Sequence, residues 1–387
     1  MARLTWLTAG ESHGPALTVI LEGVPAGLTV DVDAVNLDLA RRQRGYGRGG
    51  RMKIETDRAS ITAGVRGGVT LGSPIVLTVE NKDFANWTDR MGASPFSTPP
   101  TPMTRPRPGH ADLAGGMKFD HRDLRNVLER ASARETAGRV AAGSIARALL
   151  GALGIEVFAH VVAIGGVPIA SDATPTCAAA RASDMACVDP DAETRMRKAI
   201  LDAAHRGDTL GGVFEVVATG AMPGLGSHVQ WNQRLDGKLA QALMSIQAIK
   251  GVEIGLGFEA AQRLGSAVHD PIGYDDTARR FLRSSNGAGG LEGGMSNGEP
   301  IVCRAAMKPI STLKKALPSV DIETKASVDA AHERSDVCAV PAASVVGEAM
   351  VLLVLAEAVL EKFGGDAMRD LVAAVTHYKT RVTEFPA

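Results

Sequence analysis

A strand, a tight turn and a helix follow one another twice along the chain. Apolar and polar residues alternate over residues 17–22, a Gly/Pro segment at 23–28 turns the chain, and a second short β run leads into a predicted helix at 33–42. The same order recurs at 212–225, ahead of a predicted helix at 233–249. We interpret the recurrence as an internal duplication. The alternative is that glycine-proline turns of this kind are simply common.

Two longer apolar patterns predict central helices. Residues 122–150 carry apolar side chains at helical spacing, and residues 344–363 do the same until two glycines provide a favourable C-terminal stop. Residues 93–108 are rich in proline, serine and threonine and predict an extended surface loop. No abrupt change of composition marks a domain boundary, so we expect one α+β domain over residues 1–387.

The bulk composition narrows the class of protein. The chain has 387 residues, enough to bury a substantial core, and its formal net charge is -1 from 42 basic and 43 acidic residues. No overall field therefore draws it to nucleic acid or to an anionic membrane, so an anion site must be a local cluster. The most apolar run, residues 349–356, is far shorter than the roughly 20 residues that a membrane-spanning helix needs.

Cysteine usage and the N-terminus indicate a compartment. The four cysteines lie far apart without a CxxC pair, a pattern typical of neither a disulfide scaffold nor a zinc site. Glu11 and His13 occur before an apolar signal segment could form. We therefore expect a cytoplasmic protein with no signal peptide and no metal site.

Five arginines lie within eleven residues and are separated largely by glycines: Arg41, Arg42, Arg44, Arg48 and Arg51. Guanidinium groups bind carboxylate and phosphate oxygens in pairs, and glycine allows the backbone to approach a ligand closely, so the segment is typical of a clamp for substrate anions. Two other interpretations stay open, a nucleic-acid segment that uses Tyr46 for stacking and a solvated charged loop. The near-zero net charge and the lack of further repeats disfavour nucleic acid.

Two histidines are candidates for proton transfer. His13 lies in a loop before the first predicted strand, where it could face a cleft and donate a proton. His110 follows Arg105 and Arg107, whose charges favour its neutral form until an anion binds. For either histidine alone, a structural or surface role is the commoner one.

Arg130 and Arg134 lie four residues apart in a predicted helix, with Ser132 between them. Like charges at this spacing cost a few tenths of a kcal/mol, and a bound anion would remove that cost. The alternative is that Glu129 and Glu135 neutralise the pair locally.

Three later segments carry weaker signals. Residues 286–298 hold too many glycines for an ordinary turn and suggest backbone wrapped around a flat or anionic ligand, although no Walker sequence follows. Residues 255–260 match G-x-G-x-x-A, but their context is wrong for a dinucleotide site. Residues 308–312 offer a cation, hydroxyls and amides for a phosphate. Asp336 follows Arg334 in an apolar stretch, where it could accept a proton or form a surface ion pair.

Taken in order, these segments closely resemble the chorismate synthase family. The resemblance runs from about residue 3 to residue 365 and is carried by residues 10–14, 44–49, 105–112, 130–136, 247–251, 289–295 and 334–337. It implies conversion of 5-enolpyruvylshikimate 3-phosphate to chorismate by 1,4-anti-elimination of phosphate, with reduced FMN required. It also implies a β-α-β sandwich with internal pseudo-twofold duplication, central helices between antiparallel sheets, and a homotetramer.

The resemblance assigns roles to residues of this chain. His13, His110 and Asp336 would be catalytic, with His110 protonating the departing phosphate, Asp336 helping the flavin take the ring proton, and His13 acting between flavin and substrate. Substrate anions would be bound by Arg42, Arg48, Arg51, Arg107, Ser132, Arg134 and Arg334. FMN would be surrounded by Arg130, Ala131, Ser132, Gln247, Ala248, Gly293, Lys308, Pro309, Ile310, Ser311, Thr312 and Arg334.

Two other functional classes use the same ingredients. One is an FMN-dependent oxidoreductase acting on a phosphorylated anionic substrate, and the other is an RNA-binding protein without enzymatic activity. The sequence does not decide whether NADPH or an external reductant would reduce the flavin.

Overall fold

Alternating residues near the N-terminus build a four-stranded antiparallel sheet. In the computed structural model, which describes residues 4–49, 56–331, 333 and 335–386, the strand order is β1 (Thr5–Ala9), β2 (Ala16–Glu22), β6 (Ile75–Glu80) and β3 (Ala59–Ala63). Leu17, Val19 and Leu21 of β2 are buried, and the residues between them lie nearer the solvent. One face of this sheet is therefore committed to the core.

A second antiparallel sheet has five strands. Their order is β10 (Ile249–Ile254), β15 (Ile301–Met307), β9 (Gly212–Thr219), β7 (Glu156–Ile164) and β8 (Val167–Pro168). Strand β9 supplies Phe214, which is fully buried, to the face that packs on a long apolar helix.

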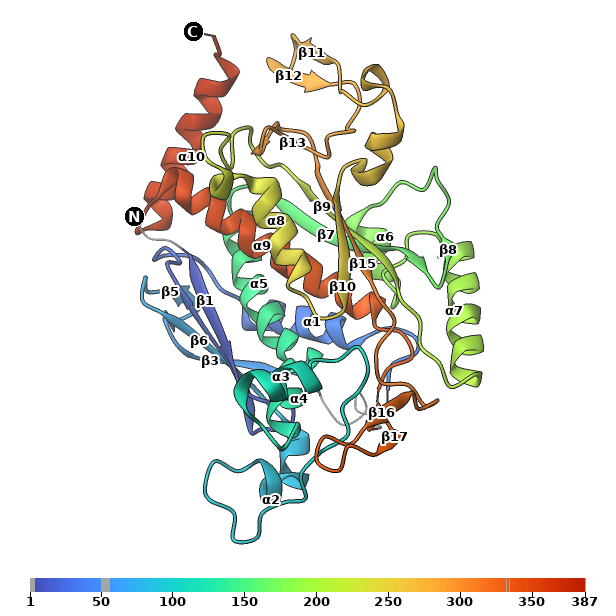
Figure 1. Ribbon diagram of the computed structural model, residues 1–387. Helices are drawn as coiled ribbons and strands as arrows, with labels where there is room; N and C mark the ends of the chain where they lie inside the picture. The colour runs from blue at the N-terminus through green and yellow to red at the C-terminus, as the bar shows by residue number, and fades with distance from the viewer. Residues whose placement is uncertain (1–3, 50–55, 332, 334, 387) are drawn as a thin grey trace.

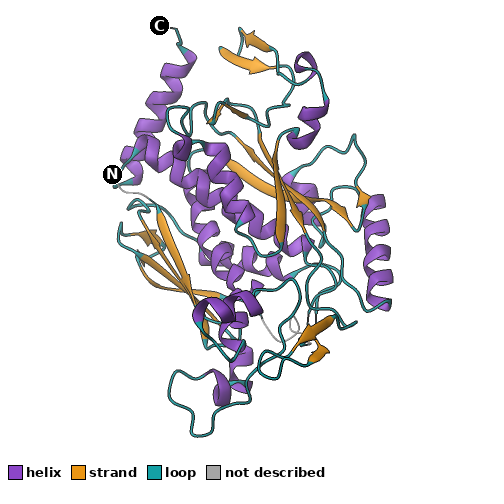
Figure 2. Cartoon of the chain, viewed as in Figure 1, coloured by secondary structure: helices purple, strands orange, loops and turns teal. Residues whose placement is uncertain are grey.

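Helices fill the space between the two sheets, as Figures 1 and 2 show. Helix α5 (Thr136–Gly151) packs on β2 and β6, helix α9 (Val340–Phe363) packs on β7 and β9, and the two helices pack on each other. Both α1 (Val32–Gln43) and α8 (Leu235–Met244) also contact α9. The close approach of α5 and α9 needs Gly143, where an added Cβ would lie 2.5 Å from that of Ala349.

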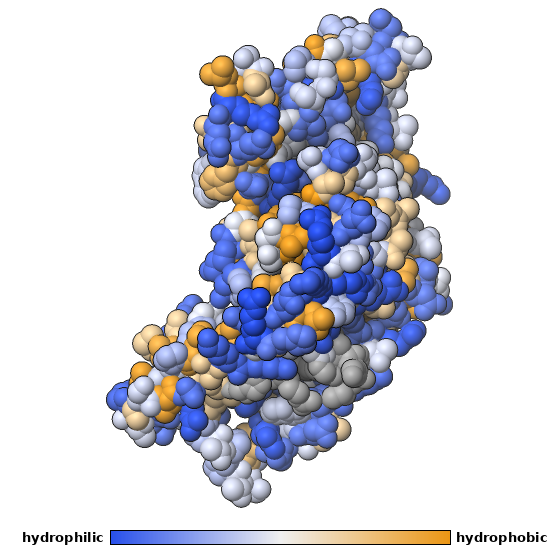
Figure 3. All heavy atoms as spheres, turned by 90° about the vertical axis from the view of Figure 1, so that its right-hand side faces the viewer, coloured by the Kyte–Doolittle hydropathy of each residue, from blue (hydrophilic) through white to orange (hydrophobic). Residues whose placement is uncertain are grey.

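Helix α9 is long and apolar enough, by length and composition, to cross a membrane. Of its most apolar stretch, 94% is buried inside the protein, as expected of the core helix of a soluble protein. The side of the molecule over α7 is mostly hydrophilic, and apolar residues are scattered over it (Figure 3).

The remaining helices and hairpins surround these layers. They are β4 (Val65–Arg66) with β5 (Val69–Thr70), η2 (Lys82–Asn86), α2 (Thr88–Met91), α3 (Asp112–Phe119), α4 (Arg125–Ala131), η3 (Ala133–Glu135), α6 (Cys177–Ala182), α7 (Pro190–His205), η4 (Trp231–Gln233), η5 (Gly257–Gln262), η6 (Gly265–Ala267), β11 (Ile272–Asp275) with β12 (Arg280–Arg283), β13 (Leu291–Glu292) with β14 (Met295–Ser296), β16 (Pro318–Val320) with β17 (Ser327–Asp329), and α10 (Met368–Thr383).

The structure confirms the α+β class and the helices predicted at 33–42 and 344–363. The single helix predicted over 122–150 is wrong, because the chain leaves helical geometry at Ser132, whose φ of -63° and ψ of 141° are extended. The helix predicted to reach residue 249 is also wrong at its end. It stops at Met244 because Ile249 begins a strand that pairs with β15.

A buried ionic cluster also holds the layers together, in addition to their apolar contacts. Glu348 of α9 is fully buried and accepts hydrogen bonds from Arg41 of α1 at 2.7 and 2.9 Å, from the amide of Ala159 in β7 at 2.8 Å, and from Arg147 of α5. Burial would raise the pKa of Glu348, but hydrogen bonds from Arg41 and the charges of both arginines lower it. One carboxylate thus joins α1, α5, α9 and β7.

The substitution Glu348→Gln should lower the free energy of unfolding by about 3–5 kcal/mol, because Arg41 and Arg147 then lose a buried counter-charge. Since the pKa of Glu348 is lowered in the folded state, its contribution is complete at neutral pH and is lost as pH falls. The difference between variant and wild type should therefore narrow in acid. Urea unfolding at several pH values measures this. Asp202→Asn, which removes an exposed ion pair with Lys198 on α7, is the control and should change nothing measurable.

Candidate functional site

A cavity of about 450 Å³ opens where α5 and α9 begin. Its apolar wall includes Leu128, Ala131, Ile246, Met307 and Val346, and its polar wall carries, among the described residues, four arginines, a lysine, two histidines and three carboxylates. The first turns of two helices face it, and helix N-termini carry partial positive charge. The cavity therefore joins an apolar surface to one that is rich in basic side chains.

Asp57 lies behind two of the arginines. Its Oδ2 accepts from Arg42 at 2.7 Å and its Oδ1 accepts from Arg134 at 2.5 Å, while Arg134 also donates to Asn81 at 2.8 Å. Burial would raise the pKa of Asp57, but the charges of both arginines lower it. The carboxylate is therefore ionised at neutral pH and holds two guanidinium groups in fixed positions at the cavity wall.

A carboxylate from far along the chain, Asp336, holds Arg48. Its Nη1 lies 2.9 Å from Oδ2 of Asp336, and the other oxygen of Asp336 accepts from the amide of Gly49 at 2.6 Å. Gly47 is needed for this close contact, because its φ is +82° and an added Cβ would lie 2.7 Å from Ile200. The glycines of the arginine-rich segment thus allow it to pack against residues 335–337.

The arginine-rich segment pairs mainly with carboxylates inside the molecule. Arg41, Arg42 and Arg48 each pair with a carboxylate inside the molecule, and Arg44 is the exposed member among the described four. Arg51 lies outside the described residues. This pairing contradicts a fully solvated loop, and the binding of substrate anions by the segment stays a prediction.

His110 shares a carboxylate with Arg107. Nδ1 of His110 lies 2.5 Å from Oδ1 of Asp112, and Arg107 donates to Asp112 from its backbone amide and its guanidinium group. Burial would raise the pKa of Asp112, but hydrogen bonds from His110 and Arg107 and the charge of Arg107 lower it. Because an ionised carboxylate only accepts, the proton of the ring is on Nδ1 in this arrangement. Arg107 also donates to the hydroxyl of Thr312 at 3.1 Å.

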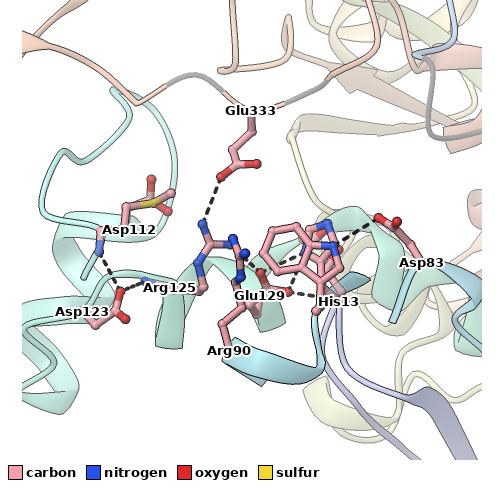
Figure 4. Close-up of polar contacts among 12 residues, drawn as sticks. His13, Asp83, Arg90, Asp112, Asp123, Arg125, Glu129 and Glu333 are labelled. Atoms are coloured by element: carbon pink, nitrogen blue, oxygen red, sulfur yellow. Dashed lines mark hydrogen bonds and ion pairs between the residues drawn. The ribbon is translucent and has the colours of Figure 1, made fainter. Parts of the chain in front are cut away.

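His13 reaches the cavity with a different carboxylate behind it. Nδ1 of His13 lies 2.9 and 3.0 Å from the two oxygens of Glu129, and the indole of Trp87 stacks on the imidazole with the ring centroids 4.0 Å apart. In Figure 4, Arg125 extends from Glu129 toward Glu333. Glu129 thus fixes the imidazole at its edge, and Trp87 fixes it from one face.

The break at Ser132 brings its hydroxyl into the cavity wall, 3.1 Å from the hydroxyl of Ser12. It also separates the two arginines predicted to lie on adjacent turns. Arg130 donates to the backbone carbonyls of Thr8 and Gly10 and does not share a site with Arg134. Among the described contacts, Glu129 binds His13 and Arg125, and Glu135 binds Arg139 and Gln247, so neither is reserved for the pair.

The structure brings most of the predicted site residues to one cavity. The members in its wall are His13, Arg42, Arg48, Arg107, His110, Ala131, Ser132, Arg134, Gln247, Ala248, Lys308, Ile310, Ser311, Thr312 and Asp336. Arg130, Pro309 and Gly293 are not in that wall, and Gly293 lies in the turn between β13 and β14. Arg51 and Arg334 lie outside the described residues. The G-x-G-x-x-A match begins a 3₁₀ helix after β10, so it is not a dinucleotide motif.

Three carboxylates that hold arginine and histidine side chains of the site were not predicted as site residues: Asp57, Asp112 and Glu129. Only Asp112 had a usable signal, since it follows His110 by two residues in the same segment. Asp57 and Glu129 contact partners 77 and 116 residues away, and no local pattern reports such pairs.

A partly apolar cavity with clustered arginines, a lysine and histidines in its wall defines an enzyme for a small polyanionic molecule. A family model described as chorismate synthase matches residues 4–360. The chorismate synthase of Trichlorobacter lovleyi is 56% identical over 394 residues, covering 99% of this chain and 100% of that protein. That of Aquifex aeolicus is 53% identical over 394 residues, covering 99% of each. A solved structure titled "Crystal Structure of Chorismate Synthase" superposes with a TM-score of 0.80 at 44% identity and covers 99% of both chains.

This chain belongs to the chorismate synthase family, and it is a lyase of the shikimate pathway that forms chorismate. Family membership decides against the oxidoreductase and RNA-binding alternatives.

Replacing Asp57 with asparagine should lower the free energy of unfolding by about 3–5 kcal/mol, since two buried guanidinium groups lose their shared counter-charge. Inorganic phosphate should stabilise this variant more than the wild type, because an anion can occupy the place of the lost charge. Thermal unfolding with and without phosphate measures both effects. Asp33→Asn is the control, because its ion pair with Arg58 is solvent-exposed. Equal stability of the Asp57 variant and wild type would contradict the clamp.

Proposed function

We propose that the cavity binds 5-enolpyruvylshikimate 3-phosphate and reduced FMN side by side. The single observation that carries this proposal is the meeting of Arg42, Arg48, Arg107 and Arg134 in one cavity wall of a protein with a net charge of -1. The substrate has two carboxylates and a phosphate, and guanidinium groups match such oxygens bidentately. Arg51 and Arg334 remain predictions for the same role.

The other wall fits a flat, apolar ring with polar edges. Ala131, Ala248 and Ile246 present small and apolar surfaces, and residues 308 and 310–312 add a cation, backbone and hydroxyls. Oε1 of Gln247 is buried and has no hydrogen-bond partner among the described residues, so it can accept a hydrogen bond from a bound group. When bound, reduced flavin supplies transient electron donation that helps to expel phosphate without net redox change.

His110 is proposed to protonate the leaving phosphate. With Nδ1 directed to Asp112, the other ring nitrogen is the one that can meet a leaving group, and Asp112 stabilises the protonated ring. The phosphate would lie among Arg107 and Lys308, which stabilise the developing charge.

Asp336 and His13 are proposed to handle the other protons. Asp336 would help the flavin to take the ring proton, and the ion pair with Arg48 keeps its carboxylate at the cavity wall. His13 would act between flavin and substrate. Ser132 would contact both ligands, since its hydroxyl lies in the wall beside Ser12.

The wider architecture is also part of the proposal. The units β2–turn–α1 and β9–turn–α8 have the same order, and both helices contact α9, which supports an internal pseudo-twofold duplication within one domain. We further propose a cytoplasmic homotetramer. Four free cysteines, three of them buried, are consistent with a reducing compartment.

An anaerobic assay with photoreduced FMN and no NADPH tests the reaction and the cofactor together. We expect one phosphate released for each chorismate formed, while the flavin remains reduced at the end. Stoichiometric loss of reduced flavin would contradict the elimination. A second assay with oxidised FMN and NADPH shows whether the enzyme reduces its own flavin.

The variant His110→Ala should lose turnover by roughly 10²- to 10⁴-fold, the range typical of a lost general acid. FMN affinity should change little, since the proposed contact is with phosphate. Steady-state kinetics and flavin titration measure the two quantities. His205→Ala at the exposed end of α7 is the matched control and should behave as wild type. Turnover of the His110 variant within a few-fold of wild type would remove this assignment.

A further inference from the structure

We infer that Glu129, which lies behind the cavity wall, is a positioning residue that fixes the proton of His13 on Nδ1 and stabilises the charged imidazolium. This inference rests on the proposed role of His13 in proton transfer. Nothing in the sequence pattern assigned Glu129 more than local neutralisation of arginines.

The contacts of Glu129 are almost all with the His13 loop and one arginine. Its side chain is 1% exposed, its two oxygens lie 2.9 and 3.0 Å from Nδ1 of His13, and Oε2 accepts from the backbone amide of His13 at 2.8 Å. The backbone carbonyl of Glu129 accepts from the amide of Ser12 at 3.0 Å. One residue thus holds both the backbone and the ring of His13.

The geometry selects one tautomer. Burial would raise the pKa of Glu129, but hydrogen bonds and charge from His13, with the charge of Arg125, lower it, so the carboxylate is ionised and can only accept. The proton nearest to Glu129 therefore belongs to Nδ1. Nε2 is then the nitrogen that exchanges a proton with the cavity, and donation from it requires the charged ring, which the carboxylate stabilises.

The surroundings set how strongly Glu129 can act. Trp87 stacks on the imidazole at 4.0 Å with an interplanar angle of 27° and donates from its indole N–H to Asp83 at 3.3 Å. Arg125 donates to Oε1 of Glu129 at 3.0 Å and lies 5.0 Å from the centre of the Trp87 ring. The positive charge of Arg125 offsets part of the negative potential that Glu129 exerts on the ring. The two opposing charges together therefore determine how strongly an imidazolium at His13 is stabilised.

Further charged groups extend the network of polar contacts around His13 that Figure 4 shows. Glu333 accepts from Arg125 at 3.4 Å on the side away from Glu129, and Arg90 lies 5.2 Å from the Trp87 ring. The charged groups around His13 in Figure 4 are therefore Glu129 and Arg125 of α4, Asp83 of η2 and Arg90 of α2, and Glu333 binds the far side of Arg125. Of these groups, Glu129 contacts Nδ1 of the imidazole directly, through both of its carboxylate oxygens.

Glutamine at position 129 separates charge from position. Its carbonyl oxygen can still accept from the amide and Nδ1 of His13, but it carries no charge. We expect Glu129→Gln to fold and to bind substrate with a KM within about threefold of wild type. At neutral pH its kcat should fall about tenfold, and the limb of the pH–rate profile that depends on His13 should move by about one pH unit toward acid. Lowering the pH should therefore restore most of the rate. Glu129→Ala also removes the oxygens that hold the amide and ring of His13, so lowering the pH should not restore its rate.

The chain offers a matched control in a second glutamate–histidine pair. Glu215 lies 3.0 Å from Nε2 of His160 within the five-stranded sheet and outside the cavity wall. Glu215→Gln should leave the pH–rate profile in place. A Glu129→Gln enzyme with the wild-type profile, or with a lower kcat and no movement of the limb, would overturn the inference.

A measurement without activity gives an independent test. In ¹⁵N-histidine-labelled protein free of flavin, the His13 signal, assigned by its loss in His13→Ala, should show the proton on Nδ1. Glu129→Ala should lose this preference, and an Nε2–H tautomer in the wild type would overturn the inference. If His13→Ala retains full turnover, the proposed catalytic role of His13 fails, whatever the tautomer shows.

Discussion

Asp57 accepts a guanidinium N–H from Arg42 on one oxygen and from Arg134 on the other, and the whole cavity depends on pairing of this kind. A site for a molecule with several negative charges must gather positive charge away from water. An uncompensated buried cation costs several kcal/mol, so each one needs a carboxylate behind it when no ligand is present. Asp112 serves Arg107 in this way and Asp336 serves Arg48, while Asp112 and Glu129 also hold the imidazoles of His110 and His13.

The same pairs give the site its precision. A guanidinium group held by two hydrogen bonds has few orientations, and a histidine held at Nδ1 presents a defined nitrogen to its ligand. An incoming substrate then meets donors that need little rearrangement, which is how a preorganised site stabilises charge that develops during a reaction. The carboxylates also offset part of the positive potential of the arginines.

The scaffold carries the same principle into the core. Glu348 joins Arg41 to Arg147 between the layers. Arg41 directly precedes Arg42, the arginine that Asp57 holds at the cavity. The register of α1 is therefore set by a buried ionic contact on one side and by the site on the other. Close approach of α5 and α9 through Gly143 brings the beginnings of both helices to the cavity. The arrangement of the helices and the placement of the cationic side chains are thus consequences of one set of contacts.

The sequence by itself determined the local elements and the chemistry available. Apolar periodicity located α1 and α9, and the arginine and histidine segments identified the basic side chains of the cavity wall, because both signals depend on neighbours along the chain. Only the tertiary structure decided where the helix breaks at Ser132, which carboxylate holds which cation, and that Arg130 turns away from Arg134. Those outcomes depend on contacts such as Arg41 with Glu348 and His13 with Glu129, between residues 307 and 116 positions apart. Local spacing carries no information about such pairs, since only the folded chain brings their charges within hydrogen-bonding distance.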